Sequence, residues 1–141
     1  MDNYLEMSSI ESIFNDFVDN YVAKEKRNRI TQFYTKKKNW WKIVIEFHTS
    51  NVFDKNVLLE IKPSEQIGDL IYKRMKDLGA KNECYSILDY LNDKNYNYSL
   101  QTKLNETVGM LCETVLYCPI SKVGYFEGGH AKDRFIFKLK N

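Results

Sequence analysis

The sequence has few of the residues on which extracellular scaffolds and metal sites depend. Its 141 residues include 3 Cys, 2 His, 2 Pro and 6 Gly. Cys84, Cys112 and Cys118 are an odd number without a Cys-x-x-Cys spacing, so neither a disulfide framework nor a paired zinc motif is indicated. A zinc site that combines these cysteines with His130 would need long-range convergence that the spacing does not indicate. We therefore expect no bound metal, reduced thiols and a cytoplasmic location.

A long hydrophobic run is also missing. No stretch approaches the ~20 apolar residues that a membrane-spanning helix needs. Residues 1–23 have neither the basic region nor the unbroken apolar run of a signal peptide. We therefore expect no signal peptide and no membrane partner.

Motifs of common catalytic sites are missing as well. No serine or cysteine lies in a Gly-x-Ser-x-Gly type of turn, and there is no Gly-rich phosphate loop. His48 is expected to be an ordinary residue at the end of a strand. His130 lies close in sequence to Glu127 and Asp133, as acid–base chemistry would require, but a polar turn with local ion pairs is the favoured interpretation. We expect no enzymatic activity and no cofactor.

What the sequence does have is the composition of a globular protein. Hydrophobic residues make up 43% and charged residues 28% of the chain. A chain of this length buries roughly two thirds of the surface of its unfolded form, so it needs no metal or disulfide to hold a core. No Pro-rich linker and no internal repeat divide the sequence, so we expect one domain over residues 1–141.

The charges are unevenly distributed, although the formal net charge is only +2. Residues 1–23 contain acidic residues and no Lys or Arg, whereas residues 24–42 contain one acidic residue, Glu25, among many basic ones. The basic residues of this second segment are Lys24, Lys26, Arg27, Arg29, Lys36, Lys37, Lys38 and Lys42. Such segregation favours long-range steering of a charged partner.

Helical periodicity is clearest near the start of the chain and predicts a helix over residues 9–23. Ser8 and Glu11 form a capping-box pair at its beginning. The apolar residues at helical spacing are Ile10, Ile13, Phe14, Phe17, Val18 and Tyr21.

From residue 30 the hydrophobic period changes to two. It predicts strands over residues 31–37 and 40–49, joined by a turn at residues 38–39, and a third strand over residues 57–61. The residues of the second strand that are expected to face the core are Trp41, Ile43, Ile45 and Phe47.

The rest of the chain predicts two helices and four short strands. One helix begins at Ser64 and ends before Gly79, and the other begins at Ser99. The strands are expected over residues 83–89, 114–118, 123–127 and 134–139. These elements predict an α+β fold in which a largely antiparallel sheet of about six to seven strands packs against the N-terminal helix and two further helices.

The basic segment supports a nucleic-acid hypothesis. Basic strands with exposed aromatic rings bind single strands by neutralising phosphates and stacking on bases. The residues that would do so in the predicted basic and aromatic β-hairpin are Lys36, Lys37, Lys38, Trp40 and Trp41. The nearly balanced total charge and the lack of a recognisable nucleic-acid motif make this hypothesis the alternative rather than the first choice.

A tyrosine-rich polar segment over residues 90–98 indicates a recognition surface. Tyr90, Tyr96 and Tyr98 occur there with Asp93. Tyrosine combines a large apolar ring with a hydrogen-bonding hydroxyl, which suits it to protein interfaces. The same rings are equally suited to cover the domain's own core.

A C-terminal segment carries a family resemblance. The sequence from Cys118 to Gly128, CPISKVGYFEG, followed by DRFI from Asp133 to Ile136, resembles the closing segment of small bacterial immunity proteins of polymorphic or contact-dependent toxin systems. The resemblance implies a non-catalytic intracellular inhibitor that binds one cognate toxin domain and occludes its active or substrate-binding surface. The resemblance assigns no catalytic or contact residue to a position of this chain.

The resemblance leaves two charged surfaces as docking candidates. Immunity proteins of nuclease toxins are often strongly acidic, whereas this chain is slightly basic. A basic toxin would suit the acidic helix face with Glu6, Glu11, Asp16 and Asp19. An acidic toxin would suit the lysine-rich residues 36–38 instead, and the sequence alone does not choose between them.

Overall fold

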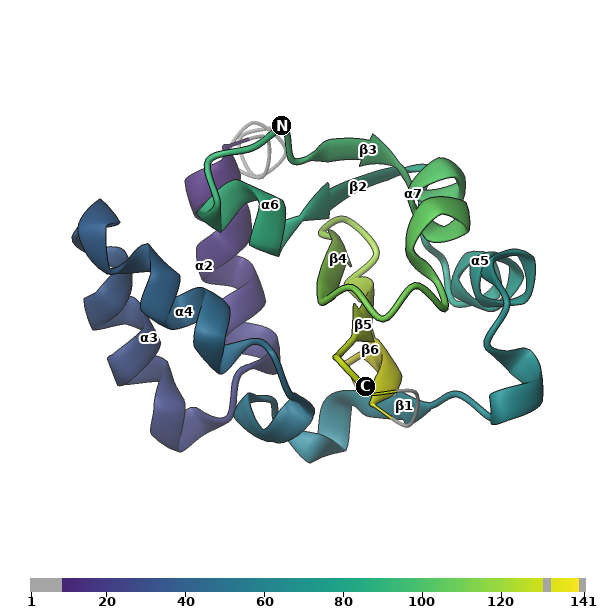
Figure 1. Ribbon diagram of the computed structural model, residues 1–141, viewed down its shortest axis with the longest axis horizontal. Helices are drawn as coiled ribbons and strands as arrows, with labels where there is room; N and C mark the ends of the chain where they lie inside the picture. The colour runs from purple at the N-terminus through teal and green to yellow at the C-terminus, as the bar shows by residue number, and fades with distance from the viewer. Residues whose placement is uncertain (1–8, 131–132, 140–141) are drawn as a thin grey trace.

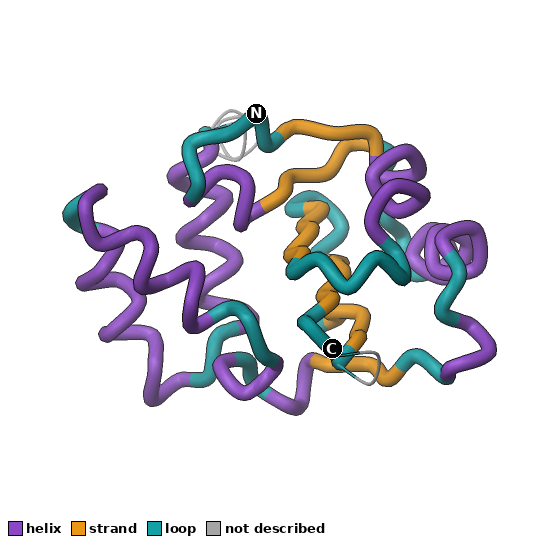
Figure 2. Tube along the Cα trace, viewed as in Figure 1, coloured by secondary structure: helices purple, strands orange, loops and turns teal. Residues whose placement is uncertain are grey.

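The computed structural model describes residues 9–130 and 133–139 and confirms the α+β fold class. Within these residues it has six α-helices and one six-stranded antiparallel sheet (Figures 1 and 2). The helices are α2 (Ile10–Tyr21), α3 (Arg27–Tyr34), α4 (Trp40–Glu46), α5 (Gly68–Asp77), α6 (Ile87–Leu91) and α7 (Leu100–Thr107). The strands are β1 (Leu58–Glu60), β2 (Glu83–Ser86), β3 (Asn97–Ser99), β4 (Thr114–Cys118), β5 (Val123–Glu127) and β6 (Arg134–Lys138).

The sheet is centred on the three strands that end the chain. Its strand order is β1-β6-β5-β4-β2-β3, and every neighbouring pair is antiparallel. β4, β5 and β6 follow one another in sequence and in space, as their short apolar runs and intervening turns predict. β1 extends the sheet beside β6, whereas β2 and β3 extend it beside β4.

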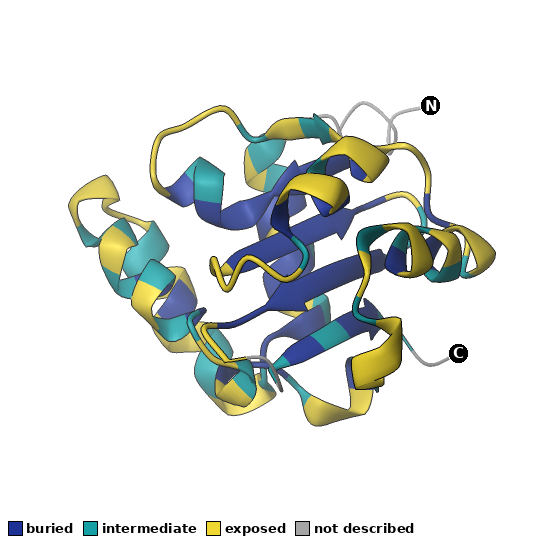
Figure 3. Ribbon diagram, turned by 45° about the vertical axis from the view of Figure 1, so that its right-hand side comes forward, coloured by how far each residue is buried: buried dark blue, intermediate teal, exposed yellow. Residues whose placement is uncertain are grey.

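Helices cover both faces of the sheet and so create two cores. α2, α3, α4 and α6 lie on one side, and α5 and α7 lie on the other (Figure 1). The central strands are therefore buried throughout, as their dark colour in Figure 3 shows. β4 supplies both cores in alternation: Val115 and Tyr117 point to the first, whereas Leu116 and Cys118 point to the second.

The first core is aromatic and is built around α2. The predicted helix is confirmed, and Phe14, Phe17 and Tyr21 are fully buried along its inner face. The rings of Phe47, Phe53, Tyr117, Phe126 and Phe137 fill the space between α2 and the sheet. Ser8, the predicted capping residue, lies outside the described residues, and the side chain of Ser9 makes no capping hydrogen bond.

The two predicted strands over residues 31–37 and 40–49 are wrong, because this segment forms the helices α3 and α4 (Figure 2). Ile43 and Phe47 are buried, as expected, but Trp41 is 57% and Ile45 is 54% exposed. The apolar positions that pack inward are Trp40, Ile43, Val44 and Phe47, at helical spacing. The basic and aromatic β-hairpin therefore does not exist, and its residues lie on a helical hairpin with a 3₁₀ turn at Lys37–Asn39.

Other boundaries differ by shorter lengths. The predicted strand 83–89 ends at Ser86, where the serine side chain accepts a hydrogen bond from the backbone N–H of Asp89 and α6 begins. Part of the predicted loop 90–98 forms β3. α5 begins at Gly68, after a 3₁₀ turn at Pro63–Glu65, and ends as predicted before Gly79, whose φ is +102°.

Candidate functional site

The helical hairpin and the segment after α6 bring four aromatic residues together on one surface. Tyr34 ends α3, Trp40 begins α4, Tyr90 lies in α6 and Tyr96 precedes β3. All four are half-buried, and we call them the aromatic patch. The ring centroids are 5.2 Å apart for Tyr34 and Trp40, 5.1 Å for Trp40 and Tyr90, and 5.4 Å for Tyr90 and Tyr96. The patch is thus a continuous aromatic layer.

The hairpin turn fixes the relative positions of the Tyr34 and Trp40 rings. The Trp40 Nε1–H donates to the backbone carbonyl of Tyr34 at 3.0 Å, across the 3₁₀ turn that links the helices. The two rings are consequently stacked, with an interplanar angle of 3°. Phe14 of α2 stacks beneath Tyr34 at 4.4 Å, which attaches the patch to the aromatic core.

Two hydroxyl groups join the aromatic layer from different elements. The hydroxyls of Tyr34 and Tyr90 form a hydrogen bond with each other. Burial and the hydrogen bond to Tyr90 raise the pKa of Tyr34, and burial also raises the pKa of Tyr90. Both phenols therefore stay uncharged at neutral pH, so the patch presents neutral donors and acceptors.

Charged residues surround the aromatic patch. Lys37 Nζ lies 3.2 Å from Asp93 Oδ2 and 5.6 Å above the centroid of the Trp40 ring. The Lys37 and Asp93 side chains are 63% and 77% exposed, so their ion pair contributes little stability. An open hollow of about 530 Å³ lies between these groups and α2. The residues that line it are Glu11, Asn15, Thr31, Tyr34, Thr35, Lys37, Trp40 and Tyr90.

The structure thus places predicted residues from three separate segments on one surface. Glu11 comes from the acidic helix, Lys37 and Trp40 from the basic segment, and Tyr90, Asp93 and Tyr96 from the tyrosine-rich segment. Lys36 and Lys38 are exposed beside Lys37 in the hairpin turn. No periodicity in the sequence predicts this convergence, because it depends on the packing of α3 and α4 against α2 and α6.

Other predicted residues have different surroundings. Asp16 binds within the molecule: its carboxylate accepts hydrogen bonds from Lys122 Nζ at 2.6 and 2.7 Å and from the Tyr117 hydroxyl. Asp19 is exposed on α2, and Glu6 lies outside the described residues. The acidic helix face is therefore less open for docking than its sequence indicates.

Tyr98 does not join the aromatic patch. It packs against the second core, whereas Tyr96 packs against the first. Its hydroxyl donates to Asp89 Oδ2 at 3.0 Å, and Lys103 Nζ lies 4.0 Å from the centre of its ring. Tyr98 thus supports the junction of α6, β3 and α7.

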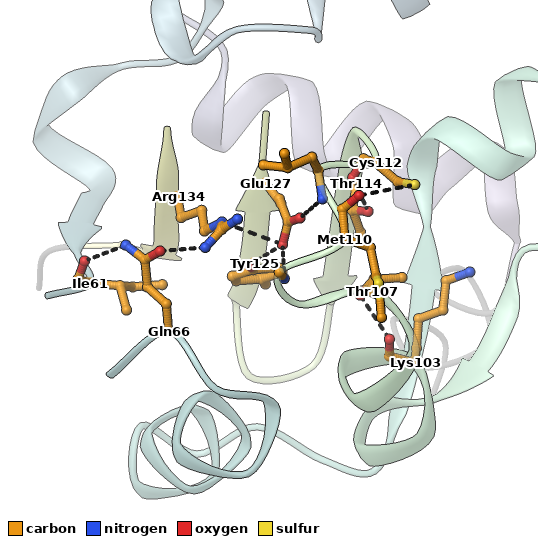
Figure 4. A network of polar contacts seen from close by, with 12 residues as sticks. Ile61, Gln66, Lys103, Thr107, Met110, Cys112, Thr114, Tyr125, Glu127 and Arg134 are labelled. Carbon is orange, nitrogen blue, oxygen red and sulfur yellow. Dashed lines mark hydrogen bonds and ion pairs between the residues drawn. The ribbon is translucent and has the colours of Figure 1, made fainter. Parts of the chain in front are cut away.

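One of the two carboxylates considered for acid–base chemistry, that of Glu127, is fully buried, and Figure 4 shows its contacts with Tyr125 and Arg134. Glu127 accepts hydrogen bonds from the Tyr125 hydroxyl at 2.7 Å and from the backbone N–H groups of Gly109 and Leu111 at 3.1 and 2.9 Å. Arg134 Nε lies 3.7 Å away. Glu127 therefore holds the segment after α7 in place and is not accessible to a substrate.

Neither of the two histidines forms a site with Glu127. His48 is half-buried and its Nδ1 lies 3.9 Å from Glu113 Oε1, whereas His130 is exposed. Asp133 accepts a hydrogen bond from the backbone N–H of Ser50 at 3.3 Å. The sequence did not reveal the Glu127–Arg134 pair, although the two opposite charges occupy paired positions of β5 and β6.

The three cysteines do not form a common site, although Cys84 and Cys118 lie on the paired strands β2 and β4. Cys84 and Cys118 are buried in the second core and Cys112 is exposed; none forms a disulfide. Within residues 9–130 and 133–139, no group of three or more His, Cys, Asp and Glu residues is arranged to hold a metal ion. In the same part of the chain, no helix has the length and apolar character that crossing a membrane requires.

Thiol reactivity gives a direct check of these positions. Burial raises the pKa of Cys84 to about 12 and raises the pKa of Cys118 as well, so neither forms the reactive thiolate at neutral pH. We expect a chromogenic disulfide reagent to modify one thiol in the folded protein and all three after denaturation. Cys112→Ser should abolish the reaction of the folded protein, and fast modification of this variant would contradict the buried positions.

Comparisons with known proteins give no assignment. A scan against protein-family models, a search of curated proteins and a search of solved structures each returned no match.

Proposed function

We propose that this chain is a non-catalytic, immunity-type protein that acts in the cytoplasm. It would bind a cognate bacterial toxin domain and occlude the active or substrate-binding surface of that domain. The observation that carries this proposal is the aromatic patch with its surrounding charges. Protein interfaces typically have aromatic residues such as tyrosine and tryptophan at the centre and polar or charged residues at the rim.

The geometry of the patch favours a macromolecular partner. Its hollow is open to solvent, so a ligand would contact a broad surface instead of entering an enclosed cavity. Small-molecule sites usually enclose most of the ligand's surface. An inhibitor of this type typically buries about 800 Å² of its own surface, and the hollow together with the neighbouring face of α4 offers adjoining surfaces for such a contact.

The fixed positions of the side chains in the patch also favour binding. Phe14, Tyr34 and Trp40 are held by stacking and by a hydrogen bond to the backbone. Side chains that are already ordered lose less conformational entropy on association. The mixed charges of Glu11, Lys37 and Asp93 would then select the orientation of a partner and increase the rate of encounter.

The proposal is tested with the product of the neighbouring gene, carrying an inactivating substitution. We expect the two purified proteins to form a complex, and the active form to be neutralised when this chain is co-expressed. Lys37→Glu should weaken the complex by about tenfold, because it places a negative charge beside Asp93 and Glu11 at the edge of the patch. Titration calorimetry measures the dissociation constant.

The matched control is Lys62→Glu, which makes the same charge change at an exposed residue before the turn at Pro63–Glu65. This turn lies between β1 and α5, at the end of the molecule opposite α3 and α4 (Figure 1). The control should bind as the wild type does. The absence of both complex formation and neutralisation would reject the immunity-type function.

A further inference from the structure

α4 has a second apolar surface, on the side away from the core. Trp41 is 57% exposed and Ile45 is 54% exposed, and the two residues lie one helical turn apart. Lys42 belongs to the same side of α4, and Lys38 precedes Trp41 by three residues in the 3₁₀ turn at Lys37–Asn39. We call these four residues the cationic stripe.

The cationic stripe is ordered by contacts within the hairpin. Lys42 Nζ lies 5.3 Å from the centre of the Phe33 ring and 5.7 Å from the centre of the Trp41 ring. Cation–π contacts of this kind are weak at exposed sites, but they limit the rotamers of both the lysine and the tryptophan. In the stripe, the side chains of Trp41 and Lys42 are therefore restricted.

The positive charge of this face is not neutralised within the hairpin. Arg29 pairs with Glu46, and Lys37 pairs with Asp93. Within the described part of the chain, Lys36, Lys38 and Lys42 have no carboxylate within 4.0 Å. An excess of cations next to an exposed tryptophan calls for a partner with the opposite charge and an apolar pocket.

We propose that the cationic stripe docks an acidic protein surface on the toxin domain, with carboxylates facing Lys38 and Lys42 and an apolar pocket for Trp41 and Ile45. This inference rests on the proposed function and specifies the chemistry of the partner. The stripe and the aromatic patch share the helix α4, since Trp40 packs against the core and Trp41 points to solvent. The proposed partner would contact the outer side of this helix through the stripe.

Three observations favour an acidic protein over the other partners. The acidic face of α2 is the alternative docking surface, for a basic partner. Its Asp16 carboxylate already binds Lys122 and Tyr117 within the fold, so it is less available to such a partner. A continuous polyphosphate along the helical hairpin would also meet the carboxylates of Glu46 and Asp93, which pair with Arg29 and Lys37 of this hairpin. Ile45 also offers no ring on which a base can stack. A localised group of carboxylates on a protein fits this surface better than nucleic acid does.

The experiment measures binding of the inactivated product of the neighbouring gene to variants of the stripe. Trp41→Ala should weaken the complex about 30-fold, because an exposed tryptophan that enters a pocket is a typical hot spot. Lys38→Glu combined with Lys42→Glu should weaken it about 100-fold at low ionic strength and by less as salt is added. The double control Lys62→Glu with Lys73→Glu, at exposed residues near and within α5, should change binding by less than about twofold.

The outcomes separate this inference from the proposed function. If the complex forms and the stripe variants bind as the wild type does, the acidic docking surface is rejected while the immunity-type function stands. If the neighbouring product does not bind and a labelled oligothymidine does, with a loss in the Lys38 and Lys42 variant, nucleic acid is the partner and both proposals are rejected. Binding to neither probe rejects both as well. Unchanged circular dichroism of Trp41→Ala will show that a loss of binding is not a loss of folding.

Discussion

Replacing Arg134 with methionine is expected to lower the free energy of unfolding by about 3 kcal/mol. The substitution retains an unbranched apolar stem at this buried position but removes the guanidinium group, whose Nε lies 3.7 Å from Glu127. The Glu127 carboxylate is fully buried, so its charge would remain in a low-dielectric environment without a cation. Three hydrogen bonds to Glu127 remain, which places the loss at the lower end of the range for a broken buried ion pair. Urea denaturation at neutral pH measures it.

Two further variants make this prediction specific. Adding Glu127→Gln to Arg134→Met should recover part of the lost stability, because a neutral amide needs no cation. Arg29→Met removes the same side chain from an exposed pair with Glu46 and should cost no more than about 1 kcal/mol. Equal losses for Arg29→Met and Arg134→Met would show that the buried pair contributes no more than a surface pair.

The Glu127 network matters because it fixes an unfavourable piece of backbone. Gly109 and Leu111 have φ values of +86° and +58°, and both donate their N–H groups to Glu127. A left-handed conformation is costly for a leucine and persists when surrounding contacts enforce it. Loss of Arg134 should therefore loosen the segment between α7 and β4 before the sheet itself unfolds.

The sheet strands near the C-terminus could be predicted because their local pattern and their tertiary surroundings agree. Each of β4, β5 and β6 is a short apolar run between turn residues, and each is buried in the sheet. α2 was predictable for the same reason. Its apolar residues lie on one face of the helix, and this face packs against a single core. Agreement between local and global preferences makes such elements readable from sequence.

The helical hairpin could not be predicted because its apolar residues fit two periods. Residues 40–47 contain Trp41, Ile43, Ile45 and Phe47 at a spacing of two. They also contain Trp40, Ile43, Val44 and Phe47 at helical spacing, and β-branched residues favoured the strand interpretation. The contacts of α4 with α3 and α6 decide between the two periods, and such contacts are not visible in a local window.

The candidate site shows the same limit. The residue types that suit a protein interface were recognisable in three segments. Two of these residues, however, bind partners within the fold: Asp16 binds Lys122, and Tyr98 binds Asp89. The sequence could not show that Glu11, Lys37 and Tyr90 border one hollow, because these residues are brought together by helix packing across long chain separations. Their role in binding a toxin stays a prediction.

Replacing Phe17 with alanine is expected to lower the free energy of unfolding by about 4 kcal/mol. Phe17 is fully buried at the centre of the aromatic core. Its ring centroid lies 5.3–6.0 Å from those of Tyr21, Phe47, Phe53, Tyr117 and Phe137. These partners belong to α2, to the segment that follows α4 and to the sheet, so the cavity cannot close without moving several elements. The loss would be a large part of the stability of a typical domain.

Phe17→Leu serves as the matched variant, because it retains an apolar side chain and should cost only about 1 kcal/mol. The same denaturation experiment measures both variants, and a similar slope against urea will show that both unfold from an equally compact state. If alanine costs no more than leucine, Phe17 does not join α2 to the sheet. Because the aromatic patch is attached to this core through Phe14, the helical surface proposed for docking would then lack the rigid support that the structure gives it.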